Sequence, residues 1–352
     1  MEMQKNKRRA DEGMGFLLRF ENVAWYEEGK VSILDRRIYP IEVRFVECSR
    51  HEEVAQAIHD MVTQSAGPYS AAAMGMALAA YEVRNEKEEK VRAFMEKAAF
   101  TLSHARPTTV EKMKEITETS LKIVQKSLDE GVKGLELVDR LQHYAVERMN
   151  NNYRKYEKIG AYLADIIPDN GTIMTQCFAE TVLGTLLNEC RRRKKQIRVI
   201  CPETRPYFQG ARLTASVVND MGFDVTVICD NMVGYTMMKK KVDLFTSAAD
   251  VITMDGYVIN KVGTFQIAML AHYFHIPYYV TGTPNLSHKT VDSVVIEERD
   301  PELVLHAMNI KVTQEGVKGY YPAFDITHPE LVNGVVTDKG ILRPDKLATY
   351  YE

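Results

Sequence analysis

Two side chains in the second half of the chain have the chemistry to move a hydrogen at a reacting carbon. Cys177 directly follows the apolar run 171–176, and Asp250 follows the run 242–246. A thiol between a strand and a helix N-terminus feels the positive end of the helix dipole, which favours the thiolate. A carboxyl group can act as general acid or base. From position alone, each also has a structural interpretation, Cys177 as a packed apolar side chain and Asp250 as a turn former.

Two further stretches carry side chains suited to binding an anion. Arg205 and Gln209 stand at a loop-to-helix junction, where a guanidinium and backbone N–H groups could bind phosphate or carboxylate. The alternative is that Arg205 and Arg212 bridge to acidic neighbours at a subunit interface. Lys261 could hold a phosphate as a point charge, and Asn260 could bond a sugar hydroxyl. Neither stretch is a Walker loop or a G-x-G-x-x-G motif, so no nucleotide fingerprint is present.

These residues fall in a region where short apolar runs alternate with helical patterns, which predicts parallel β-α-β units. In a doubly wound, Rossmann-like sheet of this kind, ligands bind outside the carboxyl ends of the strands. Polar residues follow several of the expected strands at that edge. They are Glu203, Arg205, Asp230, Asp250 and Thr283. The pattern predicts a binding site at this edge.

The N-terminal half has a different pattern. Short strands are expected at 16–20, 23–26, 30–34 and 41–46, and helices follow from about residue 51, broken at Gly67-Pro68. We therefore expect an α/β protein with a β-meander (1–50), a helical domain (51–160) and a Rossmann-like catalytic domain (161–352).

The composition excludes several classes of protein. A net charge of −3 over 352 residues gives no support to a nucleic-acid-binding role, because a phosphate backbone requires a basic surface. No apolar stretch approaches the roughly 20 residues of a membrane span, and the first 12 residues lack a signal-peptide core. The five cysteines form no C-x-x-C pair, which fits reduced thiols and argues against a zinc site. We expect a cytoplasmic protein.

Ordered motifs over nearly the whole chain resemble the methylthioribose-1-phosphate isomerase family. This family shares a superfamily with ribose-1,5-bisphosphate isomerases and the regulatory subunits of translation initiation factor 2B. The matching motifs are Glu203-Thr-Arg-Pro206, Gln209-Gly-Ala-Arg-Leu-Thr-Ala215, Ala249-Asp250, Asn260-Lys-Val-Gly-Thr264 and Pro322-Ala-Phe-Asp-Ile-Thr327, with weaker matches at Ile33-Leu-Asp-Arg36 and Ala105-Arg-Pro-Thr108.

The resemblance implies an aldose–ketose isomerase of methionine salvage that acts on a 5-substituted ribose 1-phosphate. Asp250 matches the family aspartate and would protonate the ring oxygen. Cys177 matches the family cysteine and would act at C2, as a base or by stabilising the transition state. The residues that match sugar- and phosphate-holding positions are Arg106, Gln209, Asn260 and Lys261. The resemblance implies no metal or other cofactor, a phosphorylated sugar as partner, and a homodimer formed through the C-terminal domain.

Two segments depart from the isomerase pattern. The isomerases have Arg-Gly-Ala-Pro where this chain has Ser65-Ala-Gly-Pro68, and Asn-Ala-Gly after the cysteine where this chain has Phe178-Ala-Glu180. The alternative function is therefore a non-catalytic subunit that senses sugar phosphates or nucleotides, or serves in assembly, like the initiation-factor branch. Such a subunit would keep an anion site without needing a thiol and a carboxylate.

Overall fold

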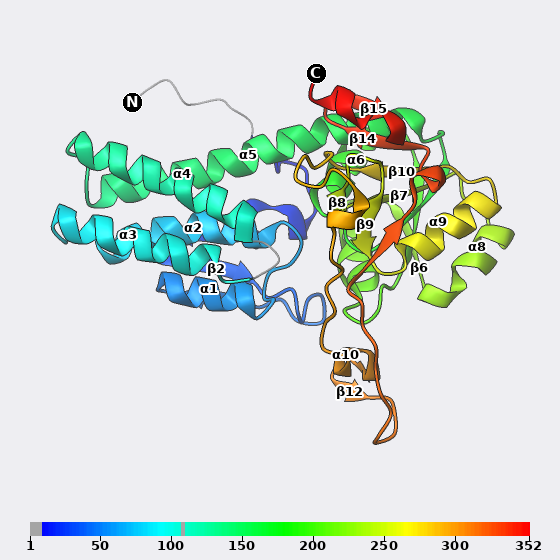
Figure 1. Cartoon of the computed structure of the whole chain (residues 1–352), viewed down its shortest axis with the longest axis horizontal. Coiled ribbons are helices and arrows are strands. Elements are labelled where there is room, and N and C mark those ends of the chain that lie inside the picture. The colour runs from blue at the N-terminus through cyan, green and yellow to red at the C-terminus, as the bar shows by residue number, and fades with distance from the viewer. Residues whose placement is uncertain (1–8, 107–109) are drawn as a thin grey trace. The chain divides into compact units, whose positions relative to one another are not determined.

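The computed structural model describes residues 9–106 and 110–352. The chain forms two compact units, and helix α5 (Leu135–Ile166) contributes residues to both (Figure 1). The first unit ends at Arg154, and the second holds Lys155–Glu352 together with Gly13–Gly15. The division into three domains at residues 50 and 160 remains a prediction.

The first unit combines a small antiparallel meander with a set of helices. Strands β1, β2 and β3 pair in chain order. Helix α2 is rich in alanine and glycine, and most of its residues are buried. At Gly75 an added Cβ would lie 2.9 Å from the Leu102 side chain, so only a residue without one lets these helices approach so closely. The elements are β1 (Trp25–Glu27), β2 (Lys30–Leu34), β3 (Phe45–Cys48), α1 (His51–His59), α2 (Gly67–Glu82), α3 (Glu88–Ser103) and α4 (Val110–Asp129).

Three expectations for this unit are wrong in detail. The expected strand at 16–20 is a pair of 3₁₀ turns, η1 (Phe16–Leu18) and η2 (Phe20–Asn22). Side chains satisfy its backbone instead of a ladder: the Asp11 carboxylate accepts from Phe20 N at 2.8 Å, and the Arg36 guanidinium donates to Leu17 O at 3.3 Å. The expected strand at 41–46 is shifted to β3. Gly67-Pro68 opens α2 instead of breaking a helix, since proline is tolerated in the first turn.

The second unit is built on a seven-stranded sheet in the order β15-β14-β10-β7-β4-β5-β6. All neighbours pair in parallel except β14 and β15. The α/β class and the mostly parallel sheet expected from the sequence are confirmed. The strands are β4 (Gly171–Thr175), β5 (Ile197–Pro202), β6 (Asp224–Ile228), β7 (Leu244–Ala248), β10 (Tyr278–Thr281), β14 (Gly334–Thr337) and β15 (Gly340–Leu342).

The strand order contains a topological switch point. From β4 the chain adds β5 and β6 on one side, and then returns to place β7 on the other side of β4. The loops after β4 and β7 therefore leave the sheet in opposite directions. In open α/β sheets this divergence creates the crevice in which ligands bind.

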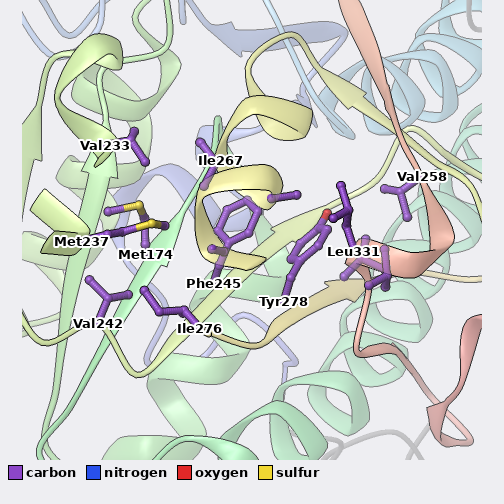
Figure 2. Close-up of a cluster of buried hydrophobic side chains, with 14 of the residues drawn as sticks. Met174, Val233, Met237, Val242, Phe245, Val258, Ile267, Ile276, Tyr278 and Leu331 are labelled. Atoms are coloured by element: carbon purple, nitrogen blue, oxygen red, sulfur yellow. The ribbon is translucent and has the colours of Figure 1, made fainter. Parts of the chain in front are cut away.

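The sheet of the second unit packs against buried apolar side chains of its helices. Figure 2 shows Phe245 of β7 and Tyr278 of β10 within this cluster, and their rings stack with centroids 4.4 Å apart. The Tyr278 hydroxyl is satisfied by Ser247 Oγ at 2.7 Å. The helices are α6 (Thr181–Arg192), the π-helix η4 (Gly210–Thr214), α7 (Ala215–Asp220), η5 (Asp230–Met232), α8 (Val233–Lys239), α9 (Thr264–Tyr273), η6 (Val291–Ser293), η7 (Pro329–Leu331) and η8 (Pro344–Tyr350).

A second, antiparallel sheet in the order β13-β9-β8 completes this unit. Between β10 and β13 the chain also forms a projecting arm, residues 300–320, which extends away from the seven-stranded sheet (Figure 1). The elements are β8 (Val251–Ile252), β9 (Val258–Lys261) and β13 (Phe324–Thr327) in the sheet, and α10 (Glu302–Leu305), β11 (His306–Ala307) and β12 (Ile310–Lys311) in the arm. Among the described residues, no helix has the length and apolar character needed to cross a membrane.

Gly210 gives a test of the packing behind the switch point. A Cβ there would lie 1.8 Å from Pro202 O, whereas a Cβ at Gly234 in α8 would lie 3.4 Å from the Leu270 side chain, an ordinary contact. Gly210→Ala should lower the free energy of unfolding by about 1–3 kcal/mol, because the helix must move off β5. Gly234→Ala should be neutral or raise it by roughly 0.5–1 kcal/mol. Urea unfolding followed by circular dichroism measures both, and equal midpoints would contradict the close approach.

Candidate functional site

Strained loops surround the switch point. Cys177, directly after β4, has a left-handed backbone with φ of +60°, and Glu180, Thr204 and Phe208 have φ of +47°, +62° and +57°. Such conformations cost roughly 1 kcal/mol or more each for non-glycine residues, and persist where the surroundings impose them. Cys177 N donates to Thr204 Oγ1 at 3.2 Å, and Cys177 O accepts from the Thr214 hydroxyl. The thiol is thereby held in place from both sides of its peptide.

The environment of Cys177 favours the neutral thiol. Burial raises its pKa to about 11. Asp250 acts in the same direction, whereas the positive charges of Lys261 and Arg299 lower the pKa. The sequence-based expectation of a thiolate is therefore wrong. The physical reason is that α6 begins only at Thr181, so the helix terminus lies beyond the thiol and the loss of hydration dominates.

Asp250 follows β7, the other strand that flanks the switch point. Its backbone N–H donates to Ile259 O at 2.9 Å, which fixes the start of the β8–β9 hairpin, and the residue is exposed. Since parallel strands end at the same edge of a sheet, β4 and β7 bring Cys177 and Asp250 to one edge. The effect of Asp250 on the pKa of Cys177 agrees with this placement.

Lys261 and Asn260 lie at the end of β9. Lys261 is only 4% exposed, and its Nζ donates to the Tyr321 hydroxyl at 3.0 Å and stands 5.3 Å from the centres of the Tyr321 and Phe324 rings. Within the part of the chain that the structure describes, no carboxylate forms an ion pair with this ammonium. Burial lowers its pKa. Asn260 Nδ2 donates to Thr264 Oγ1 at 3.0 Å and fixes the start of α9.

Asp325 of β13 stabilises the same corner. Its Oδ2 accepts from Gly263 N at 2.6 Å and from Phe265 N at 3.1 Å, so the carboxyl group caps α9. Its Oδ1 is buried without a hydrogen-bond partner, and burial raises its pKa to about 6. Gly263 has φ of +102°, and a Cβ there would lie 3.0 Å from Gln176 Nε2. A glycine is therefore required where the loop after β9 meets the end of β4.

Gln209 and Arg205 both carry buried polar atoms without partners. Gln209 is 7% exposed, and its Oε1 has no hydrogen-bond partner. Arg205 Nη2 donates to Val304 O at 3.2 Å and to His306 O at 2.8 Å, while its Nη1 is buried and unsatisfied. Arg205 therefore binds carbonyl groups of the projecting arm. Its substrate-binding role, like that of Gln209, stays a prediction.

Two other polar residues at this edge form hydrogen bonds within the chain. The Asp230 carboxylate accepts from Thr204 N at 2.8 Å and Arg205 N at 2.7 Å, and so shapes the loop after β5. Thr283 accepts from Lys155 Nζ at 2.7 Å. These two side chains hold the backbone of the site and its neighbours.

Arg106 belongs to the first unit, three residues beyond the end of α3 at Ser103. The Pro107 and Thr108 positions of its motif lie outside the described residues. The predicted role of Arg106 in substrate binding stays a prediction.

The sequence did not reveal two residues beside Lys261, namely Arg299 and Tyr321. Arg299 forms an ion pair with Glu297, with Nε–Oε1 at 2.9 Å, and its guanidinium lies 5.4 Å from the centre of the Phe324 ring. Tyr321 is 3% exposed. The available signal for Tyr321 was its place directly before the Pro322 motif. Arg299 stands in the acidic run Glu297-Glu-Arg-Asp300, which reads as an exposed surface segment and gives no signal.

The arrangement supports anion binding and proton transfer. A buried ammonium, a neutral thiol and an exposed carboxylate share one edge of the second unit. Over residues 9–106 and 110–352, the one group of side chains spaced to hold a metal ion is His51, Glu52 and Glu82, and it belongs to the first unit. The His51 Nδ1 in this group lies 2.8 Å from Glu82 Oε1, which also accepts from His51 N, a helix-capping arrangement.

Comparison with known proteins identifies the family. Residues 64–344 match the model of the Initiation factor 2 subunit family. The chain is 35% identical over 323 residues to methylthioribose-1-phosphate isomerase 1 of Pseudothermotoga lettingae, covering 89% of this chain and 92% of that protein. It is 34% identical to the methylthioribose-1-phosphate isomerase of Carboxydothermus hydrogenoformans, over 91% of this chain and 95% of the relative.

Two solved structures are also similar. The 5-methylthioribose 1-phosphate isomerase of Pyrococcus horikoshii superposes with a TM-score of 0.85 at 27% identity, over 100% of this chain and 98% of that one. The translation initiation factor eIF-2B, subunit delta, of A. fulgidus superposes with a TM-score of 0.81 at 31% identity, over 92% of this chain and 96% of that one. The resemblance derived from the motifs is confirmed.

The neutral thiol can be tested by titration. The thiolate absorbs near 240 nm, so the difference between wild type and Cys177→Ser reports Cys177 alone. Because burial raises its pKa to about 11, this difference should stay near zero through pH 9.5. Circular dichroism over the same range verifies that both proteins stay folded. Half-titration at the ordinary value of about 8.5 would contradict the placement.

Proposed function

The chain belongs to the initiation factor 2 subunit family, and on that premise we propose that it is an aldose–ketose isomerase of a 5-substituted ribose 1-phosphate. Methylthioribose 1-phosphate is the substrate, because curated relatives at 35% and 34% identity carry that activity in their names. The observation that carries the proposal is that paired strands β4 and β7 lead to Cys177 and Asp250 at the switch point, near an ammonium with which no carboxylate of the described residues forms an ion pair.

The substrate phosphate binds at Lys261. A buried ammonium without a counter-ion is costly, and a phosphate supplies the missing negative charge together with strong acceptor oxygens. Gln209 Oε1 is an unpaired acceptor suited to a sugar hydroxyl, and the unpaired Arg205 Nη1 is suited to an oxygen of the ligand. Asn260 fixes the loop that carries Lys261. Arg106 keeps its predicted role in substrate binding.

The reaction follows from the position of the phosphate. Because the anomeric oxygen is esterified, the ring opens only if an acid protonates the ring oxygen as its bond to C1 breaks. Asp250 donates this proton. A hydrogen then moves from C2 to C1, and the C2 hydroxyl loses its proton as the ketone forms, which balances the isomerisation. A thiol that is protonated at neutral pH favours the stabilising role of Cys177 at C2 over that of a base.

A homodimer formed through the second unit is part of the proposal. Large apolar side chains of α8 and α9 are exposed, and a contact between two copies would remove them from water. They are Tyr235, Met238, Met269 and Tyr273. We place the protein in the cytoplasm, because a reducing compartment keeps its five cysteines, three of them buried, as free thiols.

The alternative is a non-catalytic sensing subunit. The similarity to the initiation-factor structure and the serine at position 65 favour it. It would bind a sugar phosphate at Lys261 without converting it. A thiol and a carboxylate at the switch point are unexplained in that case.

Turnover decides between these functions. Wild type incubated with methylthioribose 1-phosphate should produce the ketose 1-phosphate, observed by ¹³C and ³¹P NMR. Cys177→Ala and Asp250→Asn should each lower kcat by about 10²- to 10⁴-fold, the usual contribution of a positioned proton-transfer group. Cys229→Ala, which removes an exposed thiol, is the matched control. Binding without any product in wild type would favour the sensor, and full activity in Cys177→Ala would remove the proposed mechanism.

The oligomeric state is a separate test. Light scattering at micromolar concentration should give twice the chain mass of 40.1 kDa. Tyr273→Glu places a charge in the exposed apolar face of α9 and should shift the protein toward the monomer. A wild-type monomer would contradict the proposal.

A further inference from the structure

Arg299 directly precedes the projecting arm (residues 300–320), and Tyr321 directly follows it. Arg299 N donates to Tyr321 O at 3.0 Å, and Ala323 N donates to Glu297 O at 2.8 Å, so the strands entering and leaving the arm are tied together at its base. Residues 300–320 extend from this base (Figure 1). Both side chains are thereby fixed next to Lys261 by backbone pairing, independently of the arm's tip.

Tyr321 offers a free hydrogen-bond donor. An ammonium only donates, so in the 3.0 Å contact the phenol oxygen accepts from Lys261 Nζ. Burial raises the pKa of Tyr321 to about 12, with Arg299 lowering it in opposition, so the phenol keeps its proton at neutral pH. Among the described residues, no side chain or backbone carbonyl accepts this proton. Cys177 also raises the pKa of Tyr321, so the hydroxyl lies near the thiol as well as near Lys261.

Glu297 occupies one edge of the Arg299 guanidinium through Nε at 2.9 Å and Nη2 at 3.1 Å. A further side-chain hydrogen bond joins Arg299 to Tyr321. Over the described ranges, Glu297 is the one carboxylate that pairs with it. A guanidinium has five N–H donors, so the remaining edge can hold a second anion.

Lys261 and Arg299 together create an excess of positive charge. Both cations contact the ring of Phe324, at 5.3 Å and 5.4 Å from its centre. Among the described residues, Glu297 is the one carboxylate in ion-pair contact with either cation, and Asp250 acts on Lys261 from a greater distance. Arg299 lowers the pKa of Lys261, as expected for two cations that repel each other across a small distance. A dianion bound between them would relieve this repulsion.

We propose that Arg299 and Tyr321 complete an anion cradle with Lys261, in which Arg299 is a second cation for the substrate's phosphate and Tyr321 donates its hydroxyl proton to a phosphate oxygen. The ligand class is the phosphoryl dianion of a sugar phosphate, so the inference rests on the proposed function. It adds two residues to the substrate-binding residues that the motifs supplied. It also gives the base of the arm a role in binding.

The test measures inorganic phosphate binding by calorimetry and the KM of the isomerase in the full chain. Arg299→Gln and Tyr321→Phe should each weaken phosphate binding and raise KM by roughly tenfold, the usual effect of losing one charge-assisted hydrogen bond, with a smaller change in kcat. Arg299→Lys, which keeps the charge, should recover part of the affinity. A merely structural role would lower the melting temperature without this split between KM and kcat.

Two matched controls lie in the same unit. Arg343→Gln removes an exposed arginine that pairs with Asp345 at 2.9 Å, an ion pair of the same spacing as Arg299–Glu297. Tyr320→Phe removes the hydroxyl of the neighbouring, exposed tyrosine. Neither should change phosphate affinity or KM.

Unchanged phosphate affinity and KM in both Arg299→Gln and Tyr321→Phe would overturn the cradle. If Arg299→Gln does not fold, Tyr321→Phe and Arg299→Lys decide the question by the same readouts. Wild-type turnover with KM unaffected by the variants would remove the cradle and leave the isomerase. Weakened phosphate binding in the variants without turnover in wild type would keep the cradle and remove the isomerase.

Discussion

The buried ammonium of Lys261 is the constraint on which the site depends. It lies at the end of β9 with a tyrosine hydroxyl and two aromatic rings around it, and no carboxylate of the described residues forms an ion pair with it. The surrounding hydrogen bonds keep its loop in place: Asp325 caps α9 from β13, and Asn260 closes the first turn. A buried, rigidly held cation next to the switch point is the feature from which the proposed anion site is argued.

Topology explains why the reacting groups meet there. Cys177 and Asp250 are separated by more than seventy residues, yet β4 and β7 pair in parallel, with Thr175 opposite Thr246. The loops after β4 and β5 adopt left-handed conformations at Cys177 and Thr204, and the Thr204 hydroxyl accepts from the backbone N–H of Cys177. The Asp230 carboxylate in turn holds Thr204. The site thus depends on a chain of hydrogen bonds across three strands.

The sequence predicted the parallel sheet and its binding edge because alternating apolar runs and helical patterns are local signals. It failed where the structure depends on long-range partners. Residues 16–20 look like a strand, but Asp11 and Arg36 satisfy their backbone instead. The sequence predicts a helix from Phe178, directly after the thiol, but α6 begins three residues later, at Thr181. Arg299 carried no signal, since its contacts with Phe324 and Lys261's corner come from pairing between segments more than twenty residues apart.

One environment determines the protonation of both Lys261 and Cys177, and this has a consequence for catalysis. Burial raises the pKa of the thiol and lowers that of the lysine, so each is driven toward its neutral form in the empty site. A phosphate dianion reverses the effect on Lys261, because the ammonium gains a counter-charge. The same negative charge works against ionisation of Cys177. Under the proposed function, substrate binding would strengthen the cation and keep the thiol protonated, so that Cys177 would meet C2 as a neutral hydrogen-bond donor while Asp250 would supply the proton for the ring oxygen.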